Sequence, residues 1–547
     1  MTQDTPWWQR SVGYQIWPRS FQDSNGDGVG DIPGIISRLD HLADLGIGFL
    51  WLSPVYASPQ QDMGYDISDY RDIAPEYGTL NDMDRLITEA KARGIGIVMD
   101  LVVNHSSDKH RWFEAAKADS GAPERDYYVW RDPGPNGEPP SDLRACFGGP
   151  AWNWNEEAGQ YYLGYFSPFQ PDLNWRNPAL RAEIYDMMNW WFDRGIAGFR
   201  MDVISLIGKD IENEVFEEGP YLHEYLQEMH QKTLKGRDVL TIGESWSVSR
   251  ETAPLYCAKD RDELDMVFQF NHIKSQWDEV HGKWKPKPFD LVAFKDELFG
   301  WQEALADAGW NSLFLSNHDL PRQVSKYGDD GEYRVRSAKA LATLTHLMKG
   351  TPFIYQGEEI GMTNIRLERI DQFRDLETIG LWHEERERGT DWDTFLAGAN
   401  ENGRDNTRTP VQWDDGPCAG FTDGMPWIEV NSNFPEINVA AERAKSDGVL
   451  AHYRKLVALR KKMDVVALGR FEAVAAEHDK VAAYLRHHDG ERLAVVANMT
   501  GDEVRFDPPE ALHIEGEGLL STVEPRYRID GPMTLAPWES FAIHARG

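Results

Sequence analysis

The sequence predicts an α/β protein built around a (β/α)₈ barrel, with a small domain inserted after the third strand and an antiparallel β-domain at the C-terminal end. Three observations predict this arrangement. Eight short runs rich in apolar, β-branched and aromatic residues are spaced along the first part of the 547-residue chain. Stretches with helical apolar spacing separate them, and period-two apolar runs follow after Lys462. Strands that alternate with helices over about 450 residues are typical of such a barrel with long insertions.

The eight predicted strands are short apolar runs. They cover 13–17, 48–52, 96–103, 198–203, 239–243, 266–270, 312–315 and 352–355. A doubly wound open sheet is the competing architecture, but no glycine-rich phosphate loop follows the first run. We expect no organic cofactor.

Two of the predicted helices show the helical pattern clearly. In 81–93, apolar residues recur at helical spacing and the segment ends at Gly94. The segment 178–194 shows the same spacing and ends at Gly195. Glycine is a common residue just past the end of a helix, so both boundaries are well marked.

Two connections are too long to be simple loops between a strand and a helix. The segment 104–170 is rich in Gly, Pro, Trp and Tyr, and we predict that it forms an inserted domain. The segment 361–438 follows the eighth strand and is predicted to be an elaborated loop. The predicted barrel therefore comprises 1–103 and 171–468. The period-two runs lie in 469–547, which is the predicted C-terminal β-domain.

The charge balance is strongly acidic, because 57 Lys and Arg against 90 Asp and Glu give a formal net charge of −33. Such a chain repels phosphate groups, so nucleic acids and membrane surfaces are not expected partners. The three cysteines, Cys146, Cys257 and Cys418, are far apart and show no disulfide or zinc pattern. The first residues lack the features of a signal peptide, and no apolar run is long enough to span a bilayer. We expect a soluble cytoplasmic protein, either a monomer or a small homo-oligomer.

Polar residues that could carry chemistry stand where the predicted strands end. They are Asn104 and His105 after the third strand, Arg200 and Asp202 at the fourth, Glu244 after the fifth, and Asn317, His318 and Asp319 after the seventh. In a barrel of this kind, these strand ends meet at one mouth. A single aspartate there is usually a cap or turn residue, but three carboxylates from three strands are difficult to explain as turns. Clustered carboxylates shift one another's pKa values, and a retaining glycosidase needs one protonated and one ionised carboxyl.

Several motifs resemble those of a known family. Four segments resemble the signature motifs of the α-amylase family of glycoside hydrolases. They are DLVVNH at 100–105, GFRMD at 198–202, GE at 243–244 and NHD at 317–319. Two more segments resemble the oligo-1,6-glucosidase subgroup of that family, namely QPDLN at 170–174 and RDNTRTPVQW at 404–413. Because these independent motifs occur in the right order, the sequence is identified as a member of the family. The family implies a barrel enzyme that cleaves glycosidic bonds in an oligosaccharide substrate.

The resemblance implies roles for the residues at the predicted mouth. Asp202 is the implied nucleophile, which forms a covalent glucosyl intermediate. Arg200, two residues earlier on the same strand, faces the same side and is expected to keep Asp202 ionised. Glu244 is the implied acid, which protonates the leaving oxygen and then activates water. Asp319 is the third implied catalytic residue, which holds the sugar hydroxyls and favours distortion of the ring. His105 and His318 are expected to bind hydroxyls nearby, although a buried structural histidine is the alternative for each.

Asp62 and Tyr65 match the family's wall around the non-reducing end of the sugar. A glycine-containing turn would explain DMGYD at 62–66 equally well. Either Arg404 or Arg408 is expected to pair with Asp62 and close this wall, and the sequence does not distinguish the two. A closed wall makes a pocket, so single glucose units would be removed from a chain end.

The loop DSNGDGVGD at 23–31 carries oxygen ligands at alternating positions, like the start of an EF-hand loop. Gly34 stands where that loop has a bidentate glutamate, so an ordinary turn is the alternative. The same loop in relatives implies a structural Ca²⁺ with no part in the chemistry. Its implied ligands are Asp23, Asn25, Asp27, the Val29 carbonyl and Asp31.

Three residues beside the implied catalytic ones bear on the linkage that is cleaved. Val203, next to Asp202, resembles the residue that α-1,6-acting members of the family have at this position, although valine is also a common strand residue. Trp246, in ESW at 244–246, resembles the corresponding tryptophan of glucan 1,6-α-glucosidases (dextran glucosidases). Lys283 resembles a lysine of their leaving-group subsite, although a solvated loop lysine is the alternative.

The resulting prediction is a retaining, exo-acting α-glucosidase that releases glucose from the non-reducing ends of α-1,6-linked isomalto-oligosaccharides or dextran. An α-1,4-preferring α-glucosidase (maltase) and an α-glucosyl transferase are the main alternatives. A trehalose-6-phosphate hydrolase would need a phosphate clamp, and none is visible in the sequence. A non-enzymatic homologue would have lost the three carboxylates, which are all present.

Overall fold

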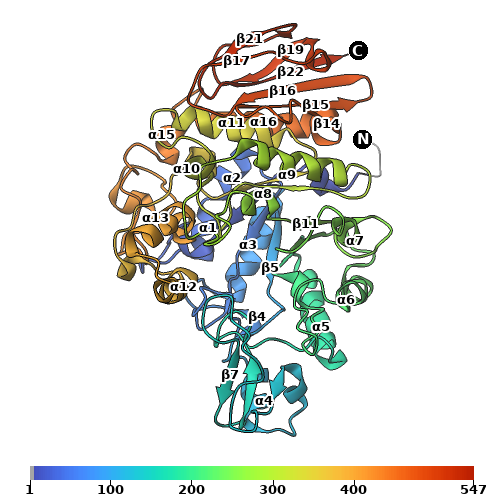
Figure 1. Cartoon of the computed structure of the whole chain (residues 1–547), viewed down its shortest axis with the longest axis vertical. Coiled ribbons are helices and arrows are strands. Elements are labelled where there is room, and N and C mark those ends of the chain that lie inside the picture. Colours follow the sequence, from blue (N-terminus) through green and yellow to red (C-terminus); the bar gives the residue numbers. More distant parts are fainter. Residues whose placement is uncertain (1–4, 547) are drawn as a thin grey trace.

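A barrel of eight parallel strands forms the centre of the computed structural model, which describes residues 5–546 (Figure 1). The barrel strands are β1 (Gly13–Ile16), β2 (Phe49–Leu52), β5 (Gly96–Leu101), β9 (Gly198–Met201), β10 (Leu240–Glu244), β11 (Met266–Phe268), β12 (Ser312–Leu313) and β13 (Thr351–Tyr355). They pair in the order β11-β10-β9-β5-β2-β1-β13-β12, and a parallel bridge between Val267 and Asn311 joins the two ends. The predicted (β/α)₈ barrel is therefore confirmed, and the doubly wound sheet is excluded.

Aromatic side chains fill the interior of the barrel. The ring of Phe268 lies 5.3 Å from that of Trp51 and 4.7 Å from that of Phe353, measured between centroids. Gly13 on β1 makes room for this packing, because a Cβ there would lie 2.6 Å from the ring of Phe49. With its interior filled, the barrel offers the rim at its strand ends for binding.

Helices surround the barrel (Figure 1). They include α1 (Ile32–Ser37), α2 (Leu39–Leu45), α3 (Leu80–Ala92), α5 (Pro178–Arg194), α6 (Leu222–Met229), α7 (Ala253–Cys257), α8 (Asn271–Lys274), α9 (Leu291–Ala304), α10 (Gln323–Tyr327) and α11 (Arg334–His346). A capping box of Thr79 and Asp82 begins α3, and α5 ends at Gly195, whose φ of 104° suits glycine. These two helices agree with those predicted from the sequence. Among the described residues, no helix is both long and apolar enough to cross a membrane.

The long connection after β5 forms a small lobe, drawn at the bottom of Figure 1. The lobe contains α4 (Arg111–Ala118) and an antiparallel sheet of β6 (Trp130–Arg131), β8 (Gln160–Leu163) and β7 (Trp152–Asn155). The chain returns beside its point of departure, because the Leu173 N–H donates to the Asn104 carbonyl at 2.9 Å. A short hairpin of β3 (Tyr56–Ala57) and β4 (Asp69–Ile73) precedes α3. The domain boundaries at 104 and 170 stay a prediction.

The connection after β13, which was predicted to be an elaborated loop, contains helices that the sequence did not indicate. Its helices are α12 (Leu376–Glu387), α13 (Trp392–Asn402), α14 (Asp405–Arg408) and α15 (Val439–Arg443). The buried residues of α12 are Thr378 and Glu385 rather than an apolar stripe, so apolar periodicity could not reveal this helix. An apolar cluster around Phe395 and Trp284, whose rings stack at 5.0 Å, holds the segment together.

Antiparallel sheets form the C-terminal part of the chain, as predicted. The larger sheet contains, in spatial order, β14 (Arg470–Val474), β15 (Val481–His488), β16 (Glu491–Asn498), β22 (Ser540–Arg546) and β19 (Glu517–Ser521). The smaller pairs are β17 (Val504–Phe506) with β21 (Met533–Leu535), and β18 (Ile514–Glu515) with β20 (Arg528–Ile529). Two helices, α16 (Val449–Lys462) and α17 (Asp464–Ala467), precede the larger sheet.

The larger C-terminal sheet rests on α11 and α16 (Figure 1). Tyr484 in this sheet donates to the Leu344 carbonyl of α11 at 2.8 Å. Lys295 of α9 donates to the carbonyls of Ala475, His478 and Val481 at 3.1, 2.6 and 3.0 Å. These bonds satisfy a buried ammonium group and fix the C-terminal sheet to the outside of the barrel.

Candidate active site

A cavity of about 240 Å³ lies at the rim of the barrel, where the strands end. Most of the residues singled out in the sequence line it. They are Asp62, Tyr65, His105, Asp202, Val203, Glu244, Trp246, Lys283, His318, Asp319 and Arg404. The two other predicted residues, Arg200 and Arg408, lie behind this lining and contact the residues in front of them.

Arg200 lies beneath the cavity and joins carboxylates from three strand ends. Its Nη1 donates to Asp202 Oδ1 at 2.9 Å and to Asp100 Oδ1 at 2.8 Å, and its Nη2 lies 2.5 Å from Glu244 Oε2. The guanidinium also lies over the ring of Trp51, 4.9 Å from its centroid. One buried cation thus holds Asp202 and Glu244 beside each other.

Glu244 ends β10 and is fixed by further donors. The Val203 N–H donates to Glu244 Oε2 at 3.0 Å, and Trp246 Nε1 donates to Oε1 at 3.2 Å. Val203 has a φ of 35° and a ψ of 44°, a left-handed conformation that is rare for a β-branched residue. This strained turn follows Asp202 directly and supplies one of the donors to Glu244, as strained backbone at functional sites often does.

Burial changes the acidity of both carboxyls that Arg200 joins. Burial raises the pKa of Asp202 well above its usual range, Arg200 lowers it, and Glu244 raises it further. Burial also raises the pKa of Glu244, again against the effect of Arg200. Arg200 therefore favours the ionised form of Asp202, as expected from the sequence, but burial opposes it. Such an environment allows one carboxyl of the pair to keep a proton near neutral pH, as a general acid must.

Asp319 has the opposite character. Burial alone would raise its pKa, but His318, Arg404 and Arg408 together lower it below its usual range. Arg404 Nη1 lies 3.3 Å and Arg408 Nη2 3.1 Å from Asp319 Oδ1. Asp319 is therefore an anion that can accept hydrogen bonds from hydroxyl groups in the cavity.

The two predicted histidines are buried and neutral. Burial lowers the pKa of His105 to about 4 and that of His318 to about 3. His318 Nε2 lies 2.6 Å from the Tyr65 hydroxyl, and the two rings stack with centroids 5.2 Å apart. His105 Nε2 lies 3.0 Å from the Tyr65 carbonyl. Neutral imidazoles beside the cavity can exchange hydrogen bonds with hydroxyls without adding charge.

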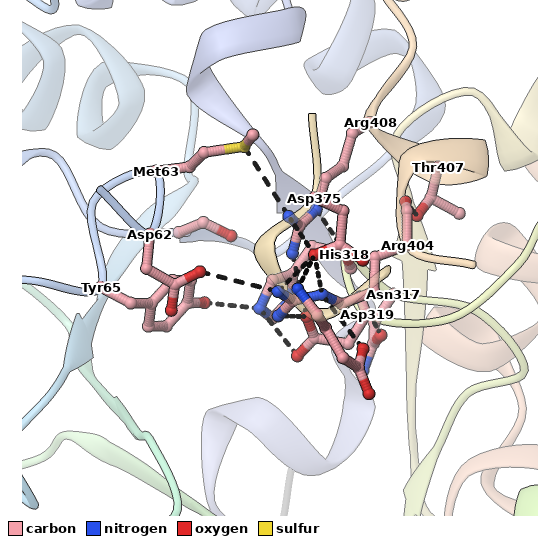
Figure 2. A network of polar contacts seen from close by, with 12 residues as sticks. Asp62, Met63, Tyr65, Asn317, His318, Asp319, Asp375, Arg404, Thr407 and Arg408 are labelled. Atoms are coloured by element: carbon pink, nitrogen blue, oxygen red, sulfur yellow. Dashed lines mark hydrogen bonds and ion pairs between the residues drawn. The ribbon is translucent and has the colours of Figure 1, made fainter. Parts of the chain in front are cut away.

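Asp62 and Arg404 both line the cavity and belong to the network that Figure 2 shows. Arg404 Nη2 lies 3.6 Å from Asp62 Oδ1, and Gln170 donates to Asp62 Oδ2 at 2.9 Å. Arg408 instead directs Nη1 toward Met63 Sδ at 3.7 Å. Of the two arginines that the sequence left open, Arg404 is therefore the one that contacts Asp62. Burial raises the pKa of Asp62 to about 7 even though both arginines lower it.

Sequence reasoning missed Asp375, which holds Arg404 in place. Asp375 Oδ1 accepts from Arg404 Nε at 2.8 Å and from Nη2 at 2.5 Å. Asp375 also caps α12, because it accepts from the N–H groups of Glu377 and Thr378. An aspartate before a helix can be recognised in a sequence, but nothing local shows that this helix begins at the cavity.

The lining also contains an aromatic group around Trp246 and an ion pair of Lys283. Trp246 stacks on Phe270 with centroids 3.8 Å apart and on Trp277 at 5.9 Å. Lys283 Nζ lies 2.6 Å from Glu377 Oε2, so this lysine is not the solvated loop residue that was the alternative. Other lining residues that the sequence analysis did not single out are Cys146, Phe147, Tyr165, Phe166, Gln170, Ser205, Leu206 and Glu217.

The loop at 23–31 is closed by its own hydrogen bonds. Asp23 accepts from three N–H groups of the loop at 2.8 Å each, and it also accepts from Thr422 at 2.5 Å. Asp31 accepts from the Gly34 N–H and thereby caps α1. Within residues 5–546, no three His, Cys, Asp or Glu side chains are grouped as metal ligands. The oxygen-rich composition suits Ca²⁺, but calcium binding stays a prediction.

Comparison with known proteins finds relatives along nearly the whole chain. The family described as Alpha amylase, catalytic domain, matches residues 15–469. A palatinase of Erwinia rhapontici is 52% identical over 543 residues, which are 98% of each chain. An oligo-1,6-glucosidase of Halalkalibacterium halodurans is 49% identical over 95% of each chain. A glucan 1,6-alpha-glucosidase of Streptococcus pneumoniae is 49% identical over 98% of this chain and 99% of the relative.

A solved structure confirms that the likeness extends to the whole fold. The crystal structure of trehalose-6-phosphate hydrolase from Bacillus licheniformis matches with a TM-score of 0.94 at 42% identity. The match covers 99% of this chain and 100% of that chain. Relatives named for different activities thus share one fold with this chain, and the fold alone does not specify the preferred substrate.

Proposed function

Because the chain belongs to the α-amylase family of glycoside hydrolases, we propose that it is a retaining, exo-acting α-glucosidase. Its proposed substrates are isomalto-oligosaccharides and dextran, from whose non-reducing ends it releases glucose. It is proposed to act in the cytoplasm, as a monomer or small homo-oligomer. One observation carries the proposal: the cavity at the strand ends holds two buried carboxyls, Asp202 and Glu244, which Arg200 joins.

In the proposed reaction, Asp202 attacks the anomeric carbon and forms a covalent β-glucosyl ester. Glu244 donates its proton to the departing glycosidic oxygen in the same step. Water then attacks the ester, and Glu244 accepts a proton from that water. Two successive inversions leave the α anomer. Asp319, held as an anion, is proposed to accept hydrogen bonds from the sugar hydroxyls during these steps.

The proposed exo action follows from the contact between Asp62 and Arg404. We propose that this pair, to which Gln170 also donates a hydrogen bond, forms a closed end of the cavity. A chain that continued past the bound glucose would have to displace a buried ion pair, which is costly. The cavity therefore suits a terminal glucose unit.

The proposed α-1,6 preference rests on three further residues of the cavity lining. An α-1,6 linkage has an extra exocyclic carbon, so the leaving sugar lies farther from the bond that breaks. We propose that Val203 forms an apolar wall, Trp246 a platform, and Lys283 a hydrogen-bond anchor for that sugar. Two relatives carry the names oligo-1,6-glucosidase and glucan 1,6-alpha-glucosidase, which supports this linkage.

A comparison of substrates tests this function. We expect kcat/KM for isomaltose and panose to exceed that for maltose by about tenfold, because apolar contacts of this size discriminate by about 1–3 kcal/mol. Lys283→Ala is expected to reduce isomaltose turnover far more than that of an aryl α-glucoside, which cannot reach the anchor. Lys285→Ala is the matched control, since Lys285 lies outside the cavity lining and pairs with Asp278. A wild-type preference for maltose would contradict the linkage and leave only the α-glucosidase assignment.

We further propose that the loop at 23–31 binds one structural Ca²⁺. Binding to the folded state alone stabilises it, by about 2.7 kcal/mol when free Ca²⁺ is at 100 times its Kd. Thermal melting should therefore occur several degrees lower in excess chelator than in millimolar Ca²⁺. The difference should disappear in an Asp27→Ala variant, because Asp27 is exposed and carries no fold contact beyond the loop. Identical melting of the wild-type protein in chelator and in Ca²⁺ would refute this proposal.

A further inference from the structure

Glu217 differs from every other carboxylate that lines the cavity. The others each contact a lysine or arginine: Asp62, Asp202, Glu244, Asp319 and Glu377. Glu217 Oε2 is buried and has no hydrogen-bond partner within residues 5–546. A buried acceptor without a donor is unfavourable, so a ligand that supplies a donor would be bound more strongly.

The fold holds Glu217 at the cavity from both sides. Phe216 stacks on Tyr165 of the inserted lobe, with ring centroids 4.8 Å apart and an interplanar angle of 5°. The Glu218 N–H donates to the carbonyl of Ser205 at 3.0 Å. Because the two neighbouring residues are fixed, the backbone of Glu217 is held beside the cavity.

Glu217 lies beside the proposed leaving-group wall. Phe216 belongs to the same apolar cluster as Val203 and Leu206, and Trp246 packs against that cluster. Burial, together with the charges of Asp172, Glu217 and Glu377, raises the pKa of the Cys146 thiol to about 12. Glu217 and Glu377 therefore both lie near Cys146, but Glu377 is neutralised by Lys283 and Glu217 is not.

We infer that Glu217 accepts a hydrogen bond from a hydroxyl of the leaving sugar and that its charge restricts this sugar to neutral ones. The inference rests on the proposed function and specifies its leaving group. An anionic group such as a phosphate would meet an unpaired carboxylate of like charge, and the two would repel each other. The two cations of the lining, Lys283 and Arg404, are already paired with Glu377 and Asp375. Neither is free to compensate a second negative charge.

The hydrogen bond is tested with isomaltose. Glu217→Ala should lower kcat/KM for isomaltose about tenfold, because the hydroxyl loses a charged acceptor. Glu217→Gln keeps an acceptor oxygen and should lose about threefold or less. Glu218→Gln is the matched control and should behave like the wild-type protein, because Glu218 contacts Tyr256 and does not line the cavity. Thermal melting establishes that each variant is folded.

The charge is tested with two aryl glucosides of nearly equal size, 4-carboxyphenyl and 4-carbamoylphenyl α-glucoside. The wild-type protein should prefer the neutral carbamoyl compound, and Glu217→Gln should raise the ratio of anionic to neutral kcat/KM about fivefold. A merely structural role would change both substrates equally. The inference is overturned if the wild-type protein cleaves isomaltose and both Glu217 variants stay within twofold of it in two quantities. These are kcat/KM for isomaltose and the ratio of anionic to neutral kcat/KM. The proposed function would then still stand. If the wild-type protein cleaves no α-glucoside, the proposed function fails and the inference fails with it.

Discussion

Replacing Asp202 with asparagine is expected to lower kcat/KM by about 10⁴- to 10⁶-fold on every α-glucoside, the size of loss seen when a covalent nucleophile is removed. The amide cannot form the glucosyl ester, so the first step has no route. The variant should still fold, because Arg200 keeps its contacts to Asp100 and Glu244. Steady-state rates on isomaltose and on an activated aryl α-glucoside measure the effect.

Chemical rescue separates a lost nucleophile from a disturbed site. In Asp202→Ala, a small anion such as azide can enter the space of the missing carboxylate and should yield β-glucosyl azide from the activated substrate. Asp186→Asn is the matched control, because Asp186 is exposed and pairs with Arg71 at 2.5 Å. Retention of more than a tenth of wild-type activity in Asp202→Asn would contradict the proposed role of Asp202.

Glu244→Gln is expected to produce a loss that depends on the leaving group. With isomaltose, whose leaving oxygen must be protonated, kcat/KM should fall about 10²- to 10⁴-fold. With a dinitrophenyl α-glucoside, which needs no proton to depart, the loss in kcat/KM should be small. Similar losses on both substrates would argue that Glu244 is not the acid.

The pH profile gives a second readout for Glu244. Burial raises the pKa of Glu244, and the acid must be protonated to act. Wild-type kcat/KM on isomaltose should therefore fall as the pH rises through this pKa, and it should also fall on the acid side, where Asp202 takes up a proton and can no longer attack. The Gln variant has no proton to lose at this position, so its residual activity should lack this alkaline decline.

Most of the fold could be predicted from the sequence because its signals are local. Each barrel strand is a short apolar run, and α3 and α5 carry an apolar stripe that ends at a glycine. The helices after β13 were not predicted, because they lack a local signal of this kind. In α12 the buried residues are polar, so its place depends on distant partners such as Arg404 rather than on its own pattern.

The candidate site could be predicted where strand ends supply it. Asp202, Glu244 and Asp319 follow barrel strands, so the topology alone brings them to one rim. Asp375 and Glu217 lie on long connections whose paths no local pattern specifies. Arg404 and Arg408 stand four residues apart in similar surroundings, and only the folded chain shows which one contacts Asp62.

In the proposed mechanism, Asp202 and Glu244 cleave the glycosidic bond in two inverting steps. Proton NMR of the first product released from isomaltose or an aryl α-glucoside, recorded before mutarotation, tests this claim directly. Retention predicts that α-glucose appears first and that the β anomer grows in only as the anomers equilibrate. Initial release of β-glucose would mean a single inversion by water and would contradict the assignment of Asp202 as the nucleophile.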